Sequence, residues 1–287
     1  MFKKKKDQTY QSYWSISWNI FKKNKVAMVC LFIVILLCLI ALFAPLIADP
    51  NKQVLTDRLM KPCGQHWFGT DDLGRDIFSR IIYGCRVSLS VGIISQIIAT
   101  VIGYTMGVCA GYFGGKVDSV ISFLIQVFSS FPFLLFAMAI MFVLGPGLIN
   151  LYLALGLLGW ASTARLIRGD VMRLKKMEYI DACKVSGGNS FRIIMKHLLP
   201  NCLSTLIVTV TLGIPNAIMS EASLSFLGLG VKAPMASWGS MISFSQPYIR
   251  SATYYSVIPG LAIIITVLAF NMLGDGLRDA LDPKLRS

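Results

Sequence analysis

Four stretches of the chain contain no charged residue and are dominated by apolar side chains: 26–47, 87–115, 119–164 and 251–274. A helix that crosses a bilayer needs about 20 such residues. The third stretch is too long for one helix, and Gly145, Pro146 and Gly147 near its middle predict a tight turn. With a further apolar segment near residue 210, the pattern predicts six membrane-spanning helices, over about 26–47, 87–111, 119–144, 148–167, 201–221 and 254–275.

The first apolar stretch differs from a secretory signal peptide. It is longer than the ~7–15 apolar residues of such a peptide, and it follows a polar leader of about 25 residues. Pro45, Asp49 and Pro50 follow it in place of a cleavage site with small residues. We therefore expect a retained helix.

Composition supports a membrane protein, because only 14% of the 287 residues are charged, against about 25% in an average soluble protein. The net charge of +13 comes from Lys and Arg residues that gather between the apolar stretches. If the N-terminus is cytoplasmic, 19 Lys and Arg lie inside and 8 outside, as the positive-inside rule prefers. No basic stretch is interleaved with aromatic residues as in a nucleic-acid groove. We predict an all-α membrane protein with both termini cytoplasmic, in contact with lipid and not with nucleic acid.

This topology divides the chain into segments. We expect a basic cytoplasmic leader at 1–25, the first membrane helix at 26–47 and an extracytoplasmic segment at 48–86. A transmembrane core at 87–277 contains a cytoplasmic loop at 170–200 and an outer segment at 222–253. That outer segment has several glycines and is moderately apolar, which is typical of a re-entrant or interfacial element, and the sequence leaves this choice open. A cytoplasmic tail follows at 278–287.

The sequence argues against catalysis and against coupling to an ion gradient. Ionisable residues are scarce in the predicted spans, and Glu221 and Asp275 fall at span ends, where we expect interface anchors or caps. His66 and His197 are predicted on opposite sides of the membrane, and no nucleophile motif is present. The seven cysteines show no metal-binding spacing, and whether Cys63 pairs with Cys85 stays open. We predict a transport subunit that is not an enzyme.

A nucleotide site is also not expected. The closest approach to a phosphate-binding loop is residues 111–117, where the spacing is one residue short and Val117 replaces the hydroxyl that binds Mg²⁺. Energy for transport must then come from a partner, with no cofactor on this chain.

The cytoplasmic loop 170–200 has the features of a short helical elbow. Residues 178–186 predict a helix, and Gly187 permits the left-handed conformation that ends one. Asn189 or Ser190 could cap a second helix over 191–199, with Pro200 at its end. Small side chains would let another protein approach closely. A basic loop that holds lipid headgroups is the alternative.

Within this loop, a set of residues resembles the coupling loop of binding-protein-dependent ABC importer permeases. Three positions depart from the family pattern: Asp181 stands for Glu, Cys183 for Ala and His197 for Ile. In that family the short helix docks in a cleft of the ATPase subunit. The resemblance assigns this role to Glu178, Asp181, Ala182, Cys183, Gly187, His197, Leu199 and Pro200.

Two further motifs are similar to the C-type permease subunit of dipeptide, oligopeptide and nickel importers. The extracytoplasmic motif consists of Gly69, Thr70, Asp71, Asp72, Gly74, Arg75 and Asp76. The outer-segment motif includes Glu221, Ser225, Gly228, Gly230, Trp238 and Gly239, and residues 271–283 extend the likeness toward the C-terminus.

The resemblance implies a type I ABC importer permease fold in a bacterial inner membrane. It also implies a homologous second permease subunit, two ATPase subunits that hold ATP and Mg²⁺, and an extracytoplasmic binding lipoprotein or periplasmic protein. The implied substrate is a short peptide, with nickel or a metal–chelator complex as the alternative. A passive channel and a structural assembly subunit are the competing classes.

Overall fold

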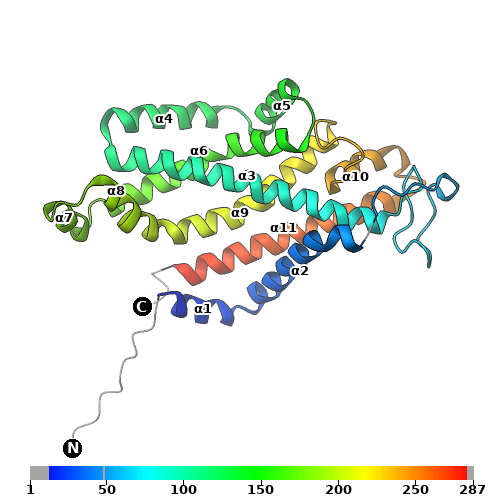
Figure 1. Cartoon of the computed structure of the whole chain (residues 1–287), viewed down its shortest axis with the longest axis horizontal. Coiled ribbons are helices and arrows are strands. Elements are labelled where there is room, and N and C mark those ends of the chain that lie inside the picture. Colours follow the sequence, from blue (N-terminus) through cyan, green and yellow to red (C-terminus); the bar gives the residue numbers. More distant parts are fainter. Residues whose placement is uncertain (1–12, 48, 283–287) are drawn as a thin grey trace, which may run out of the picture.

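The computed structural model describes residues 13–47 and 49–282, and this part of the chain is almost entirely helical. Long helices run beside one another along the long axis of the molecule (Figure 1). The short helices α7 and α8 lie at one end, and the loop of residues 49–76 lies with α10 at the other (Figure 1). Residues 1–12 of the predicted leader, Ala48, and residues 283–287 of the predicted tail lie outside the described residues.

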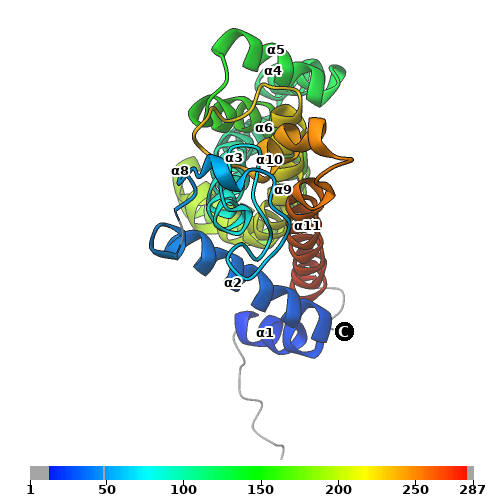
Figure 2. The same ribbon diagram turned by 90° about the vertical axis from the view of Figure 1, so that its right-hand side faces the viewer.

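The helices are α1 (Tyr13–Lys23), α2 (Lys25–Ile47), α3 (Ile77–Phe113), α4 (Gly115–Ser130), α5 (Phe133–Leu144), α6 (Leu148–Leu174), α7 (Glu178–Val185), α8 (Ser190–Ile193), α9 (Leu199–Phe226), α10 (Trp238–Ser245) and α11 (Thr253–Leu281). Short 3₁₀ turns cover Leu55–Asp57 and Gln246–Tyr248, and a π-helical turn, η2, covers Ile194–Leu198. In Figure 2, α3, α6 and α9 occupy the middle, with α4 and α5 on one side and α1 and α2 on the other.

By length and composition, four helical segments of the described chain can span a membrane: α2, α3, the combined segment Ser190–Phe226, and α11. The pair α4 and α5 makes a fifth if it is one broken span. Helix α6 covers the predicted fourth span, but it continues to Leu174 and carries several charged residues in its second half. The all-α membrane architecture is therefore confirmed, whereas the count of six spans stays a prediction.

The helix predicted over 119–144 is in fact two helices, bent by 90° at Phe131 and Pro132. A residue before proline avoids helical backbone, and Phe131 has the extended angles φ −92° and ψ 139°. The next turn forms where it was expected, because Gly145 ends α5 with φ +80°.

Two other helix boundaries differ from the prediction. Helix α3 begins at Ile77, inside the segment predicted to be extracytoplasmic, and the Asp76 side chain caps it by accepting from Ser79 N. The prediction began the helix only at the charge-free run after Arg86. The fold nevertheless buries the charged Arg80 of this stretch beside the Asp71 carboxylate, with Nε 3.4 Å from Oδ2. Helix α11 continues to Leu281, so Asp275 is an exposed residue inside a helix and not at its end.

Close packing of α3 against α6 forms the centre of the bundle. A Cβ atom added to Gly103 would lie 2.8 Å from the carbonyl oxygen of Trp160, and one added to Gly107 would lie 2.7 Å from that of Ala164. Side chains at these positions would push the two backbones apart. Small residues thus permit the close approach that is common between membrane helices.

Candidate functional site

The elbow, which we define as residues 178–198, begins with the eight-residue helix α7. The helix ends in a Schellman motif: Gly188 N donates to Cys183 O at 2.9 Å, and Gly187 N donates to Lys184 O at 3.0 Å. Gly187 has φ +78°, the left-handed conformation that a residue without Cβ adopts most easily. The predicted helix and its glycine stop are confirmed.

One face of the elbow is anchored and the other is exposed. Ile180 is completely buried and packs in a cluster with Ile193 and with residues of α3, α6 and α9. In contrast, Val185 is 90% exposed and Phe191 is 72% exposed. Of the family positions, Glu178, Asp181, Ala182, Gly187 and Pro200 are exposed, and Cys183, His197 and Leu199 are half-buried.

The second half of the elbow corrects the prediction for Pro200. Asn189 caps α8 as expected, because its side chain accepts from Arg192 N at 2.8 Å. The helix does not stop at Pro200, however, but passes through η2 directly into α9, whose first turn contains this proline. Pro200, which has no N–H to donate, lies just after the π-helical turn, where the backbone bonding changes from the i−5 to the i−4 pattern. The Asn201 side chain donates to His197 O at 2.6 Å across this junction.

Polar contacts also fasten the elbow to the bundle. Tyr112, at the end of α3, donates its hydroxyl to Ser190 Oγ in α8 at 3.3 Å. Just before the elbow, Lys175 at the end of α6 joins this helix to α3, because its Nζ donates to Tyr112 O at 2.5 Å and lies 5.6 Å from the centre of the tyrosine ring. A displacement of the elbow would therefore act directly on the ends of α3 and α6, and on α9 through the continuous helix.

The extracytoplasmic motif folds around Asp71, which is fully buried. Its carboxylate accepts from Leu73 N and Arg75 N, both at 2.9 Å, and from Arg75 Nε at 2.6 Å. Gly69 and Gly74 have φ of +77° and +69° and turn the chain around this carboxylate.

The remaining motif residues join the loop to α3 and to α11. Thr70 accepts from Met60 N at 2.8 Å and donates to Asp57 O. Asp72 accepts from Tyr255 of α11 at 3.3 Å, and Asp76 lies 3.0 Å from His66 Nδ1. The structure therefore brings these residues together as a folded outer loop.

Glu221 is the centre of a second buried network, where α3, α9 and α10 meet. It is completely buried, and its carboxyl group accepts from Ser225 Oγ at 2.6 Å, Ser237 Oγ at 2.7 Å and Ser88 Oγ at 3.5 Å. The expectation that Glu221 anchors a span end at the interface is wrong. The sequence could not reveal the network, because Ser88 and Ser237 come from distant parts of the chain.

The outer segment packs around this network. Ser237 caps α10, and Trp238 is 1% exposed with Nε1 donating to Ile81 O at 3.0 Å. A Cβ atom on Gly239 would lie 2.5 Å from Ala222 Cα, and one on Gly230 would lie 1.9 Å from Ser225 Oγ. Gly228 has φ +80° at the end of α9. This segment is thus packed on α3 and α9, and the choice between a re-entrant and an interfacial element stays open.

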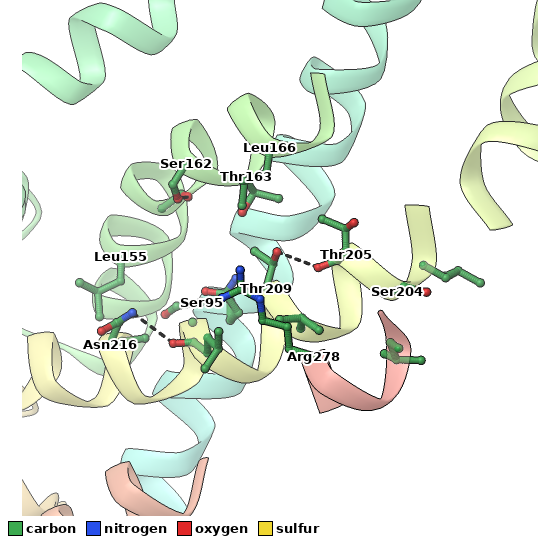
Figure 3. Close-up of a pocket in the computed structure, with 18 of the residues that line it drawn as sticks. Ser95, Leu155, Ser162, Thr163, Leu166, Ser204, Thr205, Thr209, Asn216 and Arg278 are labelled. Carbon is green, nitrogen blue, oxygen red and sulfur yellow. Dashed lines mark hydrogen bonds between the residues drawn. The ribbon is translucent and has the colours of Figure 1, made fainter. Parts of the chain in front are cut away.

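A cavity of about 1310 Å³ lies among α3, α5, α6, α9 and α11 (Figure 3). Hydroxyl and amide side chains form one part of its wall and apolar side chains, among them Phe133 and Leu134 of α5, form a larger part. The charged residues Arg173, Arg278 and Asp282 come from the elbow ends of α6 and α11. Sequence reasoning missed this surface. The sequence does contain a sign of this surface, because polar residues recur at helical spacing along one face of α9. This polar stripe consists of Asn201, Ser204, Thr205, Thr209, Asn216, Ser220 and Ser223.

Several hydroxyl groups of this stripe are compatible with a membrane helix, because they donate hydrogen bonds to the backbone of their own helix. Thr205 instead donates to Asp170 Oδ2 of α6 at 2.5 Å. Thr209 Oγ1 donates to Thr205 O at 2.7 Å, and Ser220 Oγ donates to Asn216 O at 2.8 Å. The oxygens keep free lone pairs that can accept hydrogen bonds from a solute. Together with the cavity, this stripe gives the chain a polar face inside a membrane protein.

Among the residues that the structure describes, the cysteines and the possible metal ligands do not come together in one site. Cys63 is exposed in the outer loop, Cys85 is buried in α3, and both are free thiols. The residues that the structure describes contain no group of three His, Cys, Asp or Glu side chains placed to hold a metal ion.

A helical membrane protein with an exposed elbow at one end and a polar cavity between its helices has the architecture of a transporter permease. Residues 100–287 match the family described as binding-protein-dependent transport system inner membrane component. Residues 12–62 match the N-terminal TM domain of oligopeptide transport permease C. The chain belongs to the first of these families, and it is a permease subunit and not an enzyme.

Curated relatives match over almost the whole chain. The dipeptide transport system permease protein DppC of Bacillus subtilis (strain 168) is 46% identical over 96% of this chain and 87% of that protein. The oligopeptide transport system permease protein OppC of the same strain is 42% identical over 96% and 91%. The glutathione transport system permease protein GsiD of Pectobacterium atrosepticum is 40% identical over 98% and 95%.

Among solved structures, an inward-facing conformation of the MetNI methionine ABC transporter has the same fold. The TM-score is 0.58 at 19% sequence identity, and the match covers 72% of this chain and 98% of the other. The predicted ABC importer permease fold is confirmed.

Proposed function

We propose that this chain is the C-type permease subunit of an ATP-driven importer of short peptides. The family and the polar cavity support a transport path, and the three relatives above are named for dipeptide, oligopeptide and glutathione transport, all of them peptides. These names favour a peptide over nickel or a metal–chelator complex.

The proposed machine contains a homologous second permease subunit, two ATPase subunits and an extracytoplasmic binding protein. We propose six spans in a bacterial inner membrane, with both termini in the cytoplasm. The arrangement in Figure 1 supports this orientation, because α1 and the C-terminal end of α11 lie toward the same end as the elbow. The outer loop at the opposite end then faces the binding protein.

The main support for the proposal is the elbow, where one residue is buried in the bundle and others expose apolar surface. Ile180 fixes α7 to the bundle, while Val185 and Phe191 project apolar surface away from it. Exposed apolar residues on a short, capped helix fit the surface of another protein. We propose that α7 docks on an ATPase subunit, which supplies the ATP site. Closure of the ATPase pair moves the elbow, and the continuous path through η2 transmits this movement to α9.

The test uses substitutions at Gly187, which has no neighbour within 4 Å of an added Cβ. Gly187→Val forces a β-branched residue into the left-handed conformation, at a cost of about 1–2 kcal/mol. Gly187→Asn is the matched control, because asparagine tolerates this conformation. We expect the Val variant to lose ATPase co-purification and ATP-dependent peptide uptake, and the Asn variant to keep most of both. Wild-type assembly and uptake by the Val variant would contradict the docking role.

A further inference from the structure

The cavity contains an unusual polar contact half-way along two of its helices. Gln96 lies near the middle of α3 and Gly213 near the middle of α9. A Cβ atom added to Gly213 would lie 2.2 Å from both Cδ and Oε1 of Gln96. The glutamine amide therefore rests directly on the glycine backbone, and both residues line the cavity.

At the depth of this contact, polar side chains make fewer hydrogen bonds than they are able to make. Gln96 is 9% exposed, and Nε2 donates to Thr100 Oγ1 at 3.3 Å, while Oε1 accepts no hydrogen bond from the described residues. The neighbouring Ser95 also lines the cavity, and its Oγ is buried without a partner in the described part of the chain. Figure 3 shows Ser95 and Asn216 entering the cavity region from different helices. Buried polar groups without partners cost free energy, so a solute that supplies partners at this depth gains from them.

The surroundings of Gln96 are neutral. On α9, Thr209 and Asn216 lie about one turn before and after Gly213, and both line the cavity. Thr209 Oγ1 donates to Thr205 O at 2.7 Å, and one of the two N–H groups of Asn216 Nδ2 donates to Leu212 O at 3.1 Å. Their oxygens remain able to accept. The charged lining residues of the cavity come from the elbow ends of α6 and α11, away from this level.

We propose that Ser95, Gln96, Thr209 and Asn216 form a neutral subsite that hydrogen-bonds the main-chain amide groups of a peptide in transit. The inference rests on the proposed function and specifies which groups of the substrate contact the transport path. A peptide bond offers one N–H donor and one C=O acceptor whatever its side chains are. Neutral hydroxyl and amide groups complement both, and each such hydrogen bond contributes only modestly to binding. Such contacts replace part of the substrate's hydration without trapping it, and they do not select on side-chain charge.

The test uses the whole importer in proteoliposomes, with its binding protein saturated with peptide. Gln96→Leu keeps the size of the side chain and removes its hydrogen bonds, and Gln96→Glu keeps the shape and adds charge. Thr105→Val is the matched control, because Thr105 is an exposed residue of α3 whose hydroxyl bonds its own helix at Val101 O and Ile102 O. Uptake of trialanine is measured together with ATP hydrolysis, and so is the uptake ratio of Ala-Lys-Ala to Ala-Asp-Ala.

We expect Gln96→Leu to lower trialanine uptake per ATP about five- to tenfold, the effect of losing one hydrogen bond. Gln96→Glu should shift the uptake ratio toward the lysine peptide, which a purely structural role of Gln96 would not do. Thr105→Val should match the wild type. Wild-type coupling in Gln96→Leu together with an unchanged ratio in Gln96→Glu would overturn the subsite and leave the proposed function intact. Absence of peptide uptake by the wild-type importer would instead overturn both.

Discussion

Glu221 at the outer end is completely buried and accepts from three serine hydroxyls, whereas Val185 at the elbow is 90% exposed and contributes little to the fold. The buried polar groups around Glu221 find their hydrogen-bond partners within this chain. The elbow is anchored by Ile180 but leaves apolar surface open. This difference supports the proposal that the outer end acts as a fixed cap and that another subunit docks on the elbow.

The largest effect is expected from breaking the outer network. Glu221→Leu leaves the hydroxyls of Ser225 and Ser237 without an acceptor in a buried site, and we expect a loss of about 2–5 kcal/mol of unfolding free energy. Glu221→Gln keeps an acceptor oxygen and should lose about 1 kcal/mol. Unfolding in detergent by denaturant titration measures both. If the two variants unfolded at the same denaturant concentration as the wild type, the network would not hold the outer end together.

The next effect concerns the anchor of the elbow. Ile180→Ala removes buried atoms from the cluster under α7, which should lower the local unfolding free energy of the elbow by about 2–4 kcal/mol. Val185→Ala, on the same helix but exposed, should change it by less than about 0.5 kcal/mol. Hydrogen exchange of the amides in residues 178–193 measures the difference. Equal protection in both variants would show that Ile180 does not anchor α7.

Substitutions at the exposed tip of the elbow, Val185 and Phe191, should have the smallest effect on folding. Their effect on assembly should be large. The double variant Val185→Ser, Phe191→Ser should keep the unfolding free energy of the chain within about 1 kcal/mol. Loss of apolar contact should weaken binding of the ATPase subunits at least about tenfold, since a buried Val or Phe contributes about 1.5–3 kcal/mol. Affinity is measured by titrating purified ATPase subunits onto the permease pair. Unaltered affinity would mean that docking uses another surface.

Local signals in the sequence predicted the elbow well. Gly187 and Asn189 are neighbours in sequence of the helix ends they cap, so spacing predicted the glycine stop and narrowed the N-cap to Asn189 or Ser190. Prediction failed at Pro200, because a proline in the first turn of a following helix looks the same in sequence as one that ends a helix. It also failed at Phe131, where the following proline breaks a long apolar stretch into two helices.

Long-range features could not be predicted in the same way. The burial of Glu221 and of Arg80 depends on partners that only the fold brings together, Ser88 and Ser237 for the first and Asp71 for the second. The cavity likewise arises from five helices, although the polar stripe of α9 was visible in the sequence. Family motifs located the outer residues, and the structure explains them as loop and cap contacts.

Uptake with and without the ATPase subunits tests most directly whether movement enters through the elbow. Proteoliposomes containing this chain, its second permease subunit and the peptide-loaded binding protein should accumulate no labelled peptide, even with ATP present. Addition of the two ATPase subunits and ATP should start accumulation, and the Val185→Ser, Phe191→Ser variant should abolish most of it. Accumulation against a gradient in vesicles that lack the ATPase subunits would contradict the account.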